Sequence, residues 1–152
     1  MDFLSTGINQ SIKEVGKHLM KVKKDIINLI EELPQVKFEF ENEEVLVINS
    51  IKSNYSIRIA FSEREHTVFF VGWHWHFTNE EENQYMIETI LDIIQNRTRL
   101  KEKIVNGKRK GSTLEFQNEN GEWESSLKTG MISFNFWGGK KETKYEYKKI
   151  EF

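Results

Sequence analysis

The sequence predicts one α+β domain, in which a long N-terminal helix and a central helix pack on one face of an antiparallel sheet of about six to eight strands arranged as a meander with hairpins. Two observations predict this class. Two segments repeat apolar residues with a helical period, and the segments between and after them alternate apolar with polar residues, as strands do. The chain has 152 residues, the usual size of one domain, so we expect residues 1–152 to form a single domain.

The first helical segment carries a long apolar stripe. Its members recur every three or four residues and end before Pro34, which cannot continue a helix: Ile8, Ile12, Val15, Leu19, Val22, Ile26, Leu29 and Leu33. A stripe of this kind is typical of a core helix that lies on a sheet. It is also typical of a coiled-coil seam, so a homodimer through this helix is the alternative.

Four strands are expected between the two helices, at residues 36–40, 45–48, 55–61 and 67–71. The fourth is almost continuously apolar, which predicts a central position in the sheet. Thr78 and Glu81 have the spacing of a capping box, in which each side chain satisfies the free backbone amide of the other residue. This pair predicts that the second helix begins here, and the apolar pattern predicts that it ends near Asn96.

The last third of the chain is expected to form hairpins. Residues 99–105 and 108–116 flank Asn106-Gly107, which is a strong signal for a two-residue type I′ turn. Residues 118–121 predict a second turn. Residues 131–137 and 143–150 flank Gly138-Gly139 and predict a third hairpin.

Composition excludes several classes of function. The chain has no cysteine, which rules out disulfides, thiol nucleophiles and cysteine-based zinc sites. The first residues lack a basic region followed by an apolar one, and no apolar run approaches the roughly 20 residues of a membrane span, so we expect a cytoplasmic protein without a membrane partner. The net charge is −2 and unevenly spread: residues 36–90 hold ten acidic and four basic side chains.

The segment Trp73-His74-Trp75-His76-Phe77 is the one that suggests chemistry. In an extended chain, His74 and His76 project from one face and the aromatic residues from the other. Two imidazoles at this spacing can share a metal, and a carboxylate from Glu80 or Glu81 would complete a ligand set used for zinc or non-haem iron. The alternatives are a structural histidine pair, or an aromatic patch in which Trp73 and Trp75 contact a partner protein.

Other catalytic and binding patterns are weak. The glycines lie in expected hairpin turns and form no phosphate cradle. A basic and aromatic set in the last third could contact single-stranded nucleic acid: Arg97, Arg99, Lys101, Lys103, Lys108, Arg109 and Lys110, with Trp123, Trp137, Tyr145 and Tyr147. Lysine and arginine also protect edge strands from aggregation, and the chain as a whole is slightly acidic, so a nucleic-acid partner is disfavoured.

The motif Trp73-His74-x-His76-Phe77, followed by a glutamate-rich helix start, resembles a loose class of small bacterial α+β proteins, some inferred to be immunity proteins of polymorphic or contact-dependent toxin systems. The resemblance covers residues 68–116 and implies no catalytic mechanism. It implies stoichiometric binding and blockade of a cognate toxin. Many toxins are basic nucleases, which an acidic surface would attract.

The sequence therefore favours a non-enzymatic protein-binding module without a cofactor, of the immunity-type inhibitor class. Its expected partner surface consists of Glu43 and Glu44, in the turn after the first strand, and Glu80 and Glu81 at the second helix start, together with the two tryptophans above. The alternative function is a metal-binding protein or metal-dependent enzyme that uses His74 and His76 with zinc or iron.

Overall fold

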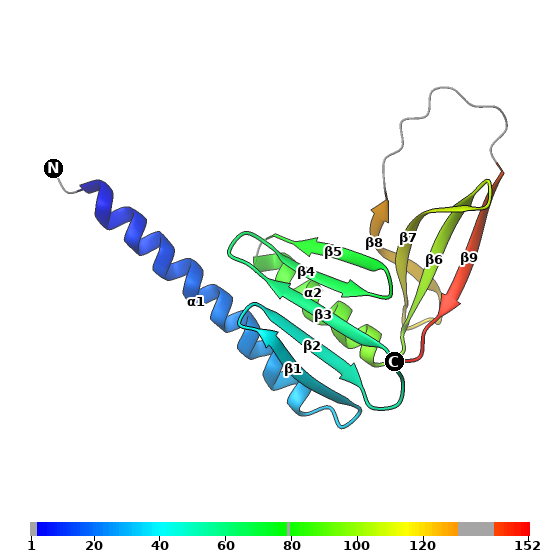
Figure 1. The fold of residues 1–152 in the computed structure, drawn as a ribbon, viewed down its shortest axis with the longest axis horizontal. Coiled ribbons are helices and arrows are strands. Elements are labelled where there is room, and N and C mark those ends of the chain that lie inside the picture. Colours follow the sequence, from blue (N-terminus) through cyan, green and yellow to red (C-terminus); the bar gives the residue numbers. More distant parts are fainter. Residues whose placement is uncertain (1–2, 79, 131–141) are drawn as a thin grey trace.

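The computed structural model describes residues 3–78, 80–130 and 142–152 (Figure 1). Within this part of the chain it contains two helices and nine strands. Their order is α1 (Phe3–Glu31), β1 (Val36–Asn42), β2 (Val45–Ser50), β3 (Ser56–Phe61), β4 (His66–Phe70), β5 (Trp73–Phe77), α2 (Glu80–Ile94), β6 (Thr98–Val105), β7 (Lys108–Gln117), β8 (Trp123–Gly130) and β9 (Thr143–Lys149). The predicted α+β class is confirmed.

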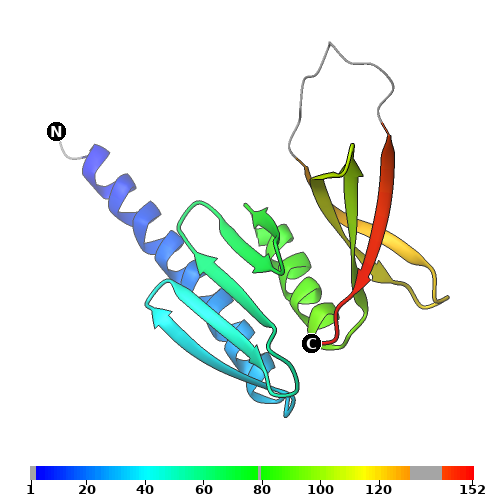
Figure 2. The same cartoon turned by 45° about the vertical axis from the view of Figure 1, so that its right-hand side comes forward.

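Strands β1 to β5 form an antiparallel meander in chain order, and both helices cover the same face of it (Figures 1 and 2). Alternation along each strand sends every second side chain to the helices. The core between these layers includes Ile26 of α1, Ile48 and Ile59 of the sheet, and Ile90 of α2, all with 0% of their surface exposed. The expected packing of two helices on one sheet face therefore holds for this part of the molecule.

The remaining strands form a second antiparallel sheet in the order β8-β7-β6-β9, whereas the sequence predicted one sheet. The chain leaves α2 through Asn96, which has a positive φ of 58°, and so starts β6 away from the first meander. Leu100, Leu114 and Phe152 of this C-terminal part nevertheless belong to the same core cluster as the first sheet. The two sheets thus share one apolar core.

Most expected elements occur where the local pattern put them. Asn106 and Gly107 both have positive φ, 49° and 74°, as a type I′ turn requires. β8 was not predicted, and β9 pairs with β6 instead of with the strand just before it in the chain. The strand expected at residues 131–137 and the Gly138-Gly139 turn lie outside the described residues.

Helix α1 contributes to the core through its C-terminal part only, as far as its side chains are described. Val22, Ile26 and Ile30 are buried, and Leu19 packs at the margin of the core. The N-terminal part of α1 extends beyond the sheet (Figure 1). The core-helix interpretation is confirmed for this C-terminal part, and the homodimer stays a prediction. Neither helix, within the described residues, is long and apolar enough to cross a membrane.

Candidate functional site

The meander brings three glutamate-rich connections to one end of the first sheet. Because its strands are antiparallel and paired in chain order, β1, β3 and β5 all finish at the same end, where their arrowheads point in Figure 1. The connections that follow them are the β1–β2 turn, the β3–β4 turn and the start of α2. We call this region the acidic end and define it by Glu43, Glu44, Glu63, Glu65, Glu80, Glu81 and Glu82.

Helix α1 crosses this end and ties its parts together. His18 contacts the first turn of α2, and Lys23 donates a hydrogen bond to the backbone carbonyl of Glu43 in the β1–β2 turn. The start of α2 is capped by Thr78, whose backbone N–H and hydroxyl both donate to the Glu82 carboxylate, which lowers the pKa of Glu82. The expected Thr78–Glu81 capping box is therefore replaced by a Thr78–Glu82 contact, in which the carboxylate accepts both hydrogen bonds and the Thr78 hydroxyl donates, and Glu81 is exposed.

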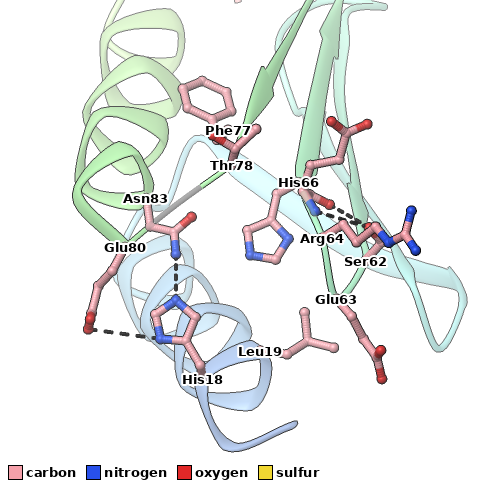
Figure 3. A pocket seen from close by; sticks show the side chains of 11 residues that line it. His18, Leu19, Ser62, Glu63, Arg64, His66, Phe77, Thr78, Glu80 and Asn83 are labelled. Atoms are coloured by element: carbon pink, nitrogen blue, oxygen red, sulfur yellow. Dashed lines mark hydrogen bonds and ion pairs between the residues drawn. The ribbon is translucent and has the colours of Figure 1, made fainter. Parts of the chain in front are cut away.

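A hollow of about 380 Å³ opens at the acidic end between α1, the β3–β4 turn and the start of α2 (Figure 3). We call it the recess. His18, His66 and Asn83 supply its polar interior, and Leu19 and Phe77 supply apolar wall. Glu63, Glu65 and Glu80 also line it, against one permanently cationic side chain, Arg64. Its volume lies at the small end of ligand pockets, which start at about 300 Å³.

Two buried polar side chains of the recess have an atom without a partner. His66 is 5% exposed and Asn83 is 6% exposed, and no hydrogen bond within the described residues reaches His66 Nδ1 or Asn83 Oδ1. The amide of Asn83 instead donates from Nδ2 to His18 Nε2 over 2.9 Å, and His18 Nδ1 lies 3.9 Å from a carboxylate oxygen of Glu80 (Figure 3). Buried polar groups normally have partners, and each missing one costs about 1–3 kcal/mol.

The electrostatics of the recess keep His66 uncharged. Burial lowers the pKa of His66, and the neighbouring His18 and Lys23 side chains act in the same direction. The ring is therefore neutral near pH 7, with one nitrogen donating and one accepting. His66 also packs edge-to-face against Phe61, with ring centroids 5.5 Å apart, which fixes its orientation.

The recess is better equipped for binding than for nucleophilic catalysis. Ser62 and Thr78 supply its described hydroxyls: that of Thr78 belongs to the start of α2, and the Ser62 Oγ donates to the Glu65 carbonyl over 2.8 Å and accepts from the Glu65 amide over 3.2 Å. A nucleophile needs a base within hydrogen-bond reach, whereas these two hydrogen bonds tie the Ser62 hydroxyl to its own turn. What the recess does offer is a pair of buried polar atoms that an incoming group can satisfy.

The structure separates the two histidines of the Trp-His-x-His motif from the expected carboxylates. β5 is extended, so His74 and His76 project from the sheet face opposite the helices, as the alternation predicted. Glu80 contacts His18 on the helix side of the sheet and cannot serve as their third ligand. His76 Nδ1 instead lies 3.0 Å from Glu65 and 3.1 Å from the Thr67 hydroxyl. Within the described residues, no group of three or more histidines and carboxylates could hold a metal ion.

The two tryptophans of the motif lie in different environments. Trp73 is 1% exposed and belongs to the core, so its expected role as a partner contact is wrong: the side chain faces the helix layer. Trp75 is half-buried and lines a second hollow of about 470 Å³ along α2, which we call the aromatic groove. Its other aromatic and acidic lining consists of Phe77, Tyr85, Phe116, Glu82, Glu88 and Asp92.

Five members of the basic and aromatic set of the last third meet on one face of the second sheet and contact one another: Arg99, Lys101, Trp123, Tyr145 and Tyr147. The Arg99 guanidinium lies 4.3 Å from the Trp123 ring centroid and 4.4 Å from that of Tyr147, and Lys101 lies 4.8 Å from that of Tyr145. These cation–π contacts occupy ring faces on which bases would otherwise stack. The cluster therefore gives no support to a nucleic-acid partner, and Trp137 lies outside the described residues.

Comparison with known proteins adds no relative: no family model, no curated protein and no solved structure matches this chain. The residues of the acidic end and its recess must therefore carry the functional argument. His18, His66 and Asn83 were not predicted as site residues from the sequence, although the sequence pattern around two of them could have indicated it. His66 alternates with Val68 and Phe70 on the core-facing side of β4, and Asn83 takes a core-facing position of α2.

Proposed function

We propose that this protein is a non-enzymatic binding module that holds a basic partner protein at its acidic end. One observation carries the proposal: the meander topology brings Glu43, Glu44, Glu80 and Glu81 from separate parts of the sequence to one end of the sheet, where Glu80 lines a recess. Exposed like charges repel one another, and of these four only Glu80 and Glu81 gain stability within the monomer, from the dipole of α2. Such a concentration is favourable when an oppositely charged surface covers it.

The arrangement supports fast and specific association. Among the residues that line the recess, the glutamates Glu63, Glu65 and Glu80 outnumber the one arginine, Arg64. A surface of one sign steers an oppositely charged partner and raises its association rate. The neighbouring aromatic groove supplies the other need of an interface, because half-buried aromatic side chains such as Trp75 are frequent energetic anchors.

The finer proposal is that the partner is a bacterial toxin and that binding blocks it, as the Trp-His-x-His-Phe resemblance implies. A basic nuclease domain fits the charge of the acidic end. An inhibitor of this class needs no turnover, which agrees with the self-contained hydrogen bonds of Ser62 in the recess.

The experiment uses three versions of the full chain as immobilised bait for lysate of the native cells. The first is the natural sequence, and the second carries lysine at positions 43, 44, 80 and 81. The third is a charge-matched control with lysine in place of Glu31, Glu32, Glu119 and Glu122, four exposed glutamates outside the acidic end. The partner retained by the first bait is identified by mass spectrometry, purified and tested for association rate and for toxin activity.

We expect the natural and control chains to retain the same basic protein, and the acidic-end variant to associate with it at least about tenfold more slowly at low salt. The difference should shrink as salt is added, because exposed charges are screened. An unchanged association rate for the acidic-end variant would show that the partner binds elsewhere. A partner that is acidic, or that keeps its full toxic activity when bound, would contradict the toxin-inhibitor hypothesis.

A further inference from the structure

We infer that the recess of His18, His66 and Asn83 is a socket for one arginine side chain of the partner protein. This inference rests on the proposed function and adds the chemistry of its central contact. The groups that define the socket are the two buried atoms without partners and the carboxylate of Glu80 at its mouth (Figure 3).

The unpartnered atoms call for a hydrogen-bond donor. Asn83 Oδ1 is a carbonyl oxygen and can only accept. His66 is a neutral imidazole, whose Nδ1 also accepts when the ring proton is on Nε2. An incoming group that donates to both would remove two unmet hydrogen-bonding requirements, whereas an apolar group would leave them in place.

The charges around the recess favour a cationic donor over an anion. Its lining residues include three glutamates, Glu63, Glu65 and Glu80, against Arg64; the Glu65 carboxylate itself pairs with His76, so Glu80 at the mouth is the main negative group for a ligand. A phosphate or carboxylate ligand would meet these acids at the entrance. Lys23 adds positive potential near His66, so the charge of the ligand is best placed toward Glu80 and away from the deepest part.

The geometry of the first turn of α2 selects a guanidinium. Glu80 and Asn83 are three residues apart and therefore lie on one side of the helix. A guanidinium presents five N–H donors in a planar fork and can donate to the Glu80 carboxylate and the Asn83 carbonyl at once. A lysine ammonium is a compact point charge and spans such a pair less well. Leu19 and Phe77 offer apolar wall for the methylene groups of the arginine.

The probe is Nα-acetyl-arginine amide, with Nα-acetyl-citrulline amide as an uncharged analogue of the same shape. Binding to the full chain is followed by NMR, through the amide signals around the recess and the side-chain amide of Asn83. We expect the arginine probe to bind with a Kd on the order of 1 mM. The citrulline probe should bind at least about tenfold more weakly, because a charge-assisted hydrogen bond is roughly twice as strong as a neutral one.

Three variants separate the socket from a nonspecific charge effect. Asn83→Leu should abolish binding of the arginine probe, and Gln84→Leu, at the next and exposed position of α2, should leave it unchanged. Glu80→Gln alters a side chain that is 74% exposed and carries little risk to folding, and it should weaken binding several-fold. Absence of shifts at about 50 mM probe, far above the expected Kd, equal binding of citrulline, or binding that survives Asn83→Leu would each overturn the socket.

Failure of the socket can be told apart from failure of the proposed function. If the arginine probe does not bind but the acidic-end variant still loses its partner, the module binds a basic protein without an arginine in the recess. If the probe binds as expected but charge reversal leaves the partner's association rate unchanged, the recess is a site for a free guanidine compound and the docking surface lies elsewhere.

Discussion

Acidification should destabilise the folded protein through His66. Burial and the neighbouring His18 and Lys23 side chains lower the folded-state pKa of this imidazole below its ordinary value of 6.5, which the unfolded chain retains. Below pH 6.5, His66 becomes protonated in the unfolded chain while it stays neutral in the folded chain. The stabilisation that depends on a neutral His66 is therefore complete above pH 6.5 and is lost progressively as the pH falls toward the folded-state pKa.

The size of this pH dependence is set by the binding of one proton to His66. Within that window, each pH unit costs up to about 1.4 kcal/mol of unfolding free energy, and the loss levels off once the folded form is also protonated. Asp92 acts in the opposite direction at lower pH, because burial raises its pKa despite the Arg97 guanidinium 2.5 Å away. The contribution of Asp92 is the same in a variant that lacks only the His66 imidazole, so it cancels in the difference between the two pH profiles of unfolding free energy.

The assay is urea unfolding between pH 7.5 and 5.0, followed by tryptophan fluorescence, to which the buried Trp73 contributes. We expect the natural chain to lose stability over this range more steeply than His66→Gln. His74→Gln, which removes an exposed histidine from the opposite face of the sheet, should keep the slope of the natural chain. If His66→Gln and the natural chain have parallel pH profiles, the neutral buried state assigned to His66 is wrong.

Two further substitutions test the backbone and the recess. Val71 has a φ of 47° in the turn before Trp73, a conformation that costs a β-branched residue about 1–2 kcal/mol, while Asn106 adopts φ 49° in the matching hairpin. Val71→Asn should therefore raise the unfolding free energy, measured in urea titrations, by up to about 1 kcal/mol. A lower unfolding free energy would mean that the packing of Val71 outweighs its backbone strain. Asn83→Leu should be as stable as the natural chain or up to about 1–2 kcal/mol more stable, because it removes an unpartnered buried carbonyl. A lower melting temperature would show that the hydrogen bond from Asn83 to His18 stabilises the fold by more than the unpartnered carbonyl costs.

The elements that could be predicted from the sequence are those whose signals are local. The alternation of Ile57, Ile59 and Phe61 and the Asn106-Gly107 turn need no knowledge of distant residues, and they occur as predicted. Strand β8 reads as a mixture of small and charged residues, with no clear alternation over its length. Its register depends on β7, and the pairing of β9 with β6 joins segments more than 35 residues apart. Such pairing is decided by packing, which a local pattern does not contain.

In the candidate site, too, some features could be predicted from the sequence and others depend on tertiary packing. The expected surface of Glu43, Glu44, Glu80 and Glu81 follows from a meander, because that topology decides which turns share an end. The recess joins residues from α1, β4 and α2, and Asn83 and His18 are 65 positions apart. What the sequence did hold was a pair of polar residues at core-facing positions, which marks a buried polar cluster without saying where its members meet.

Those polar residues link stability to function. Leaving two buried groups unmet costs about 1–3 kcal/mol each, a large share of the roughly 5–15 kcal/mol by which small domains are stable. Apolar side chains at positions 66 and 83 would extend the adjoining core of Phe77 and Met86 without this cost. A recess kept polar at the expense of stability is typical of a binding site whose missing partners arrive with the ligand. The most destabilising part of the acidic end is thus also the part best suited to recognise a specific side chain.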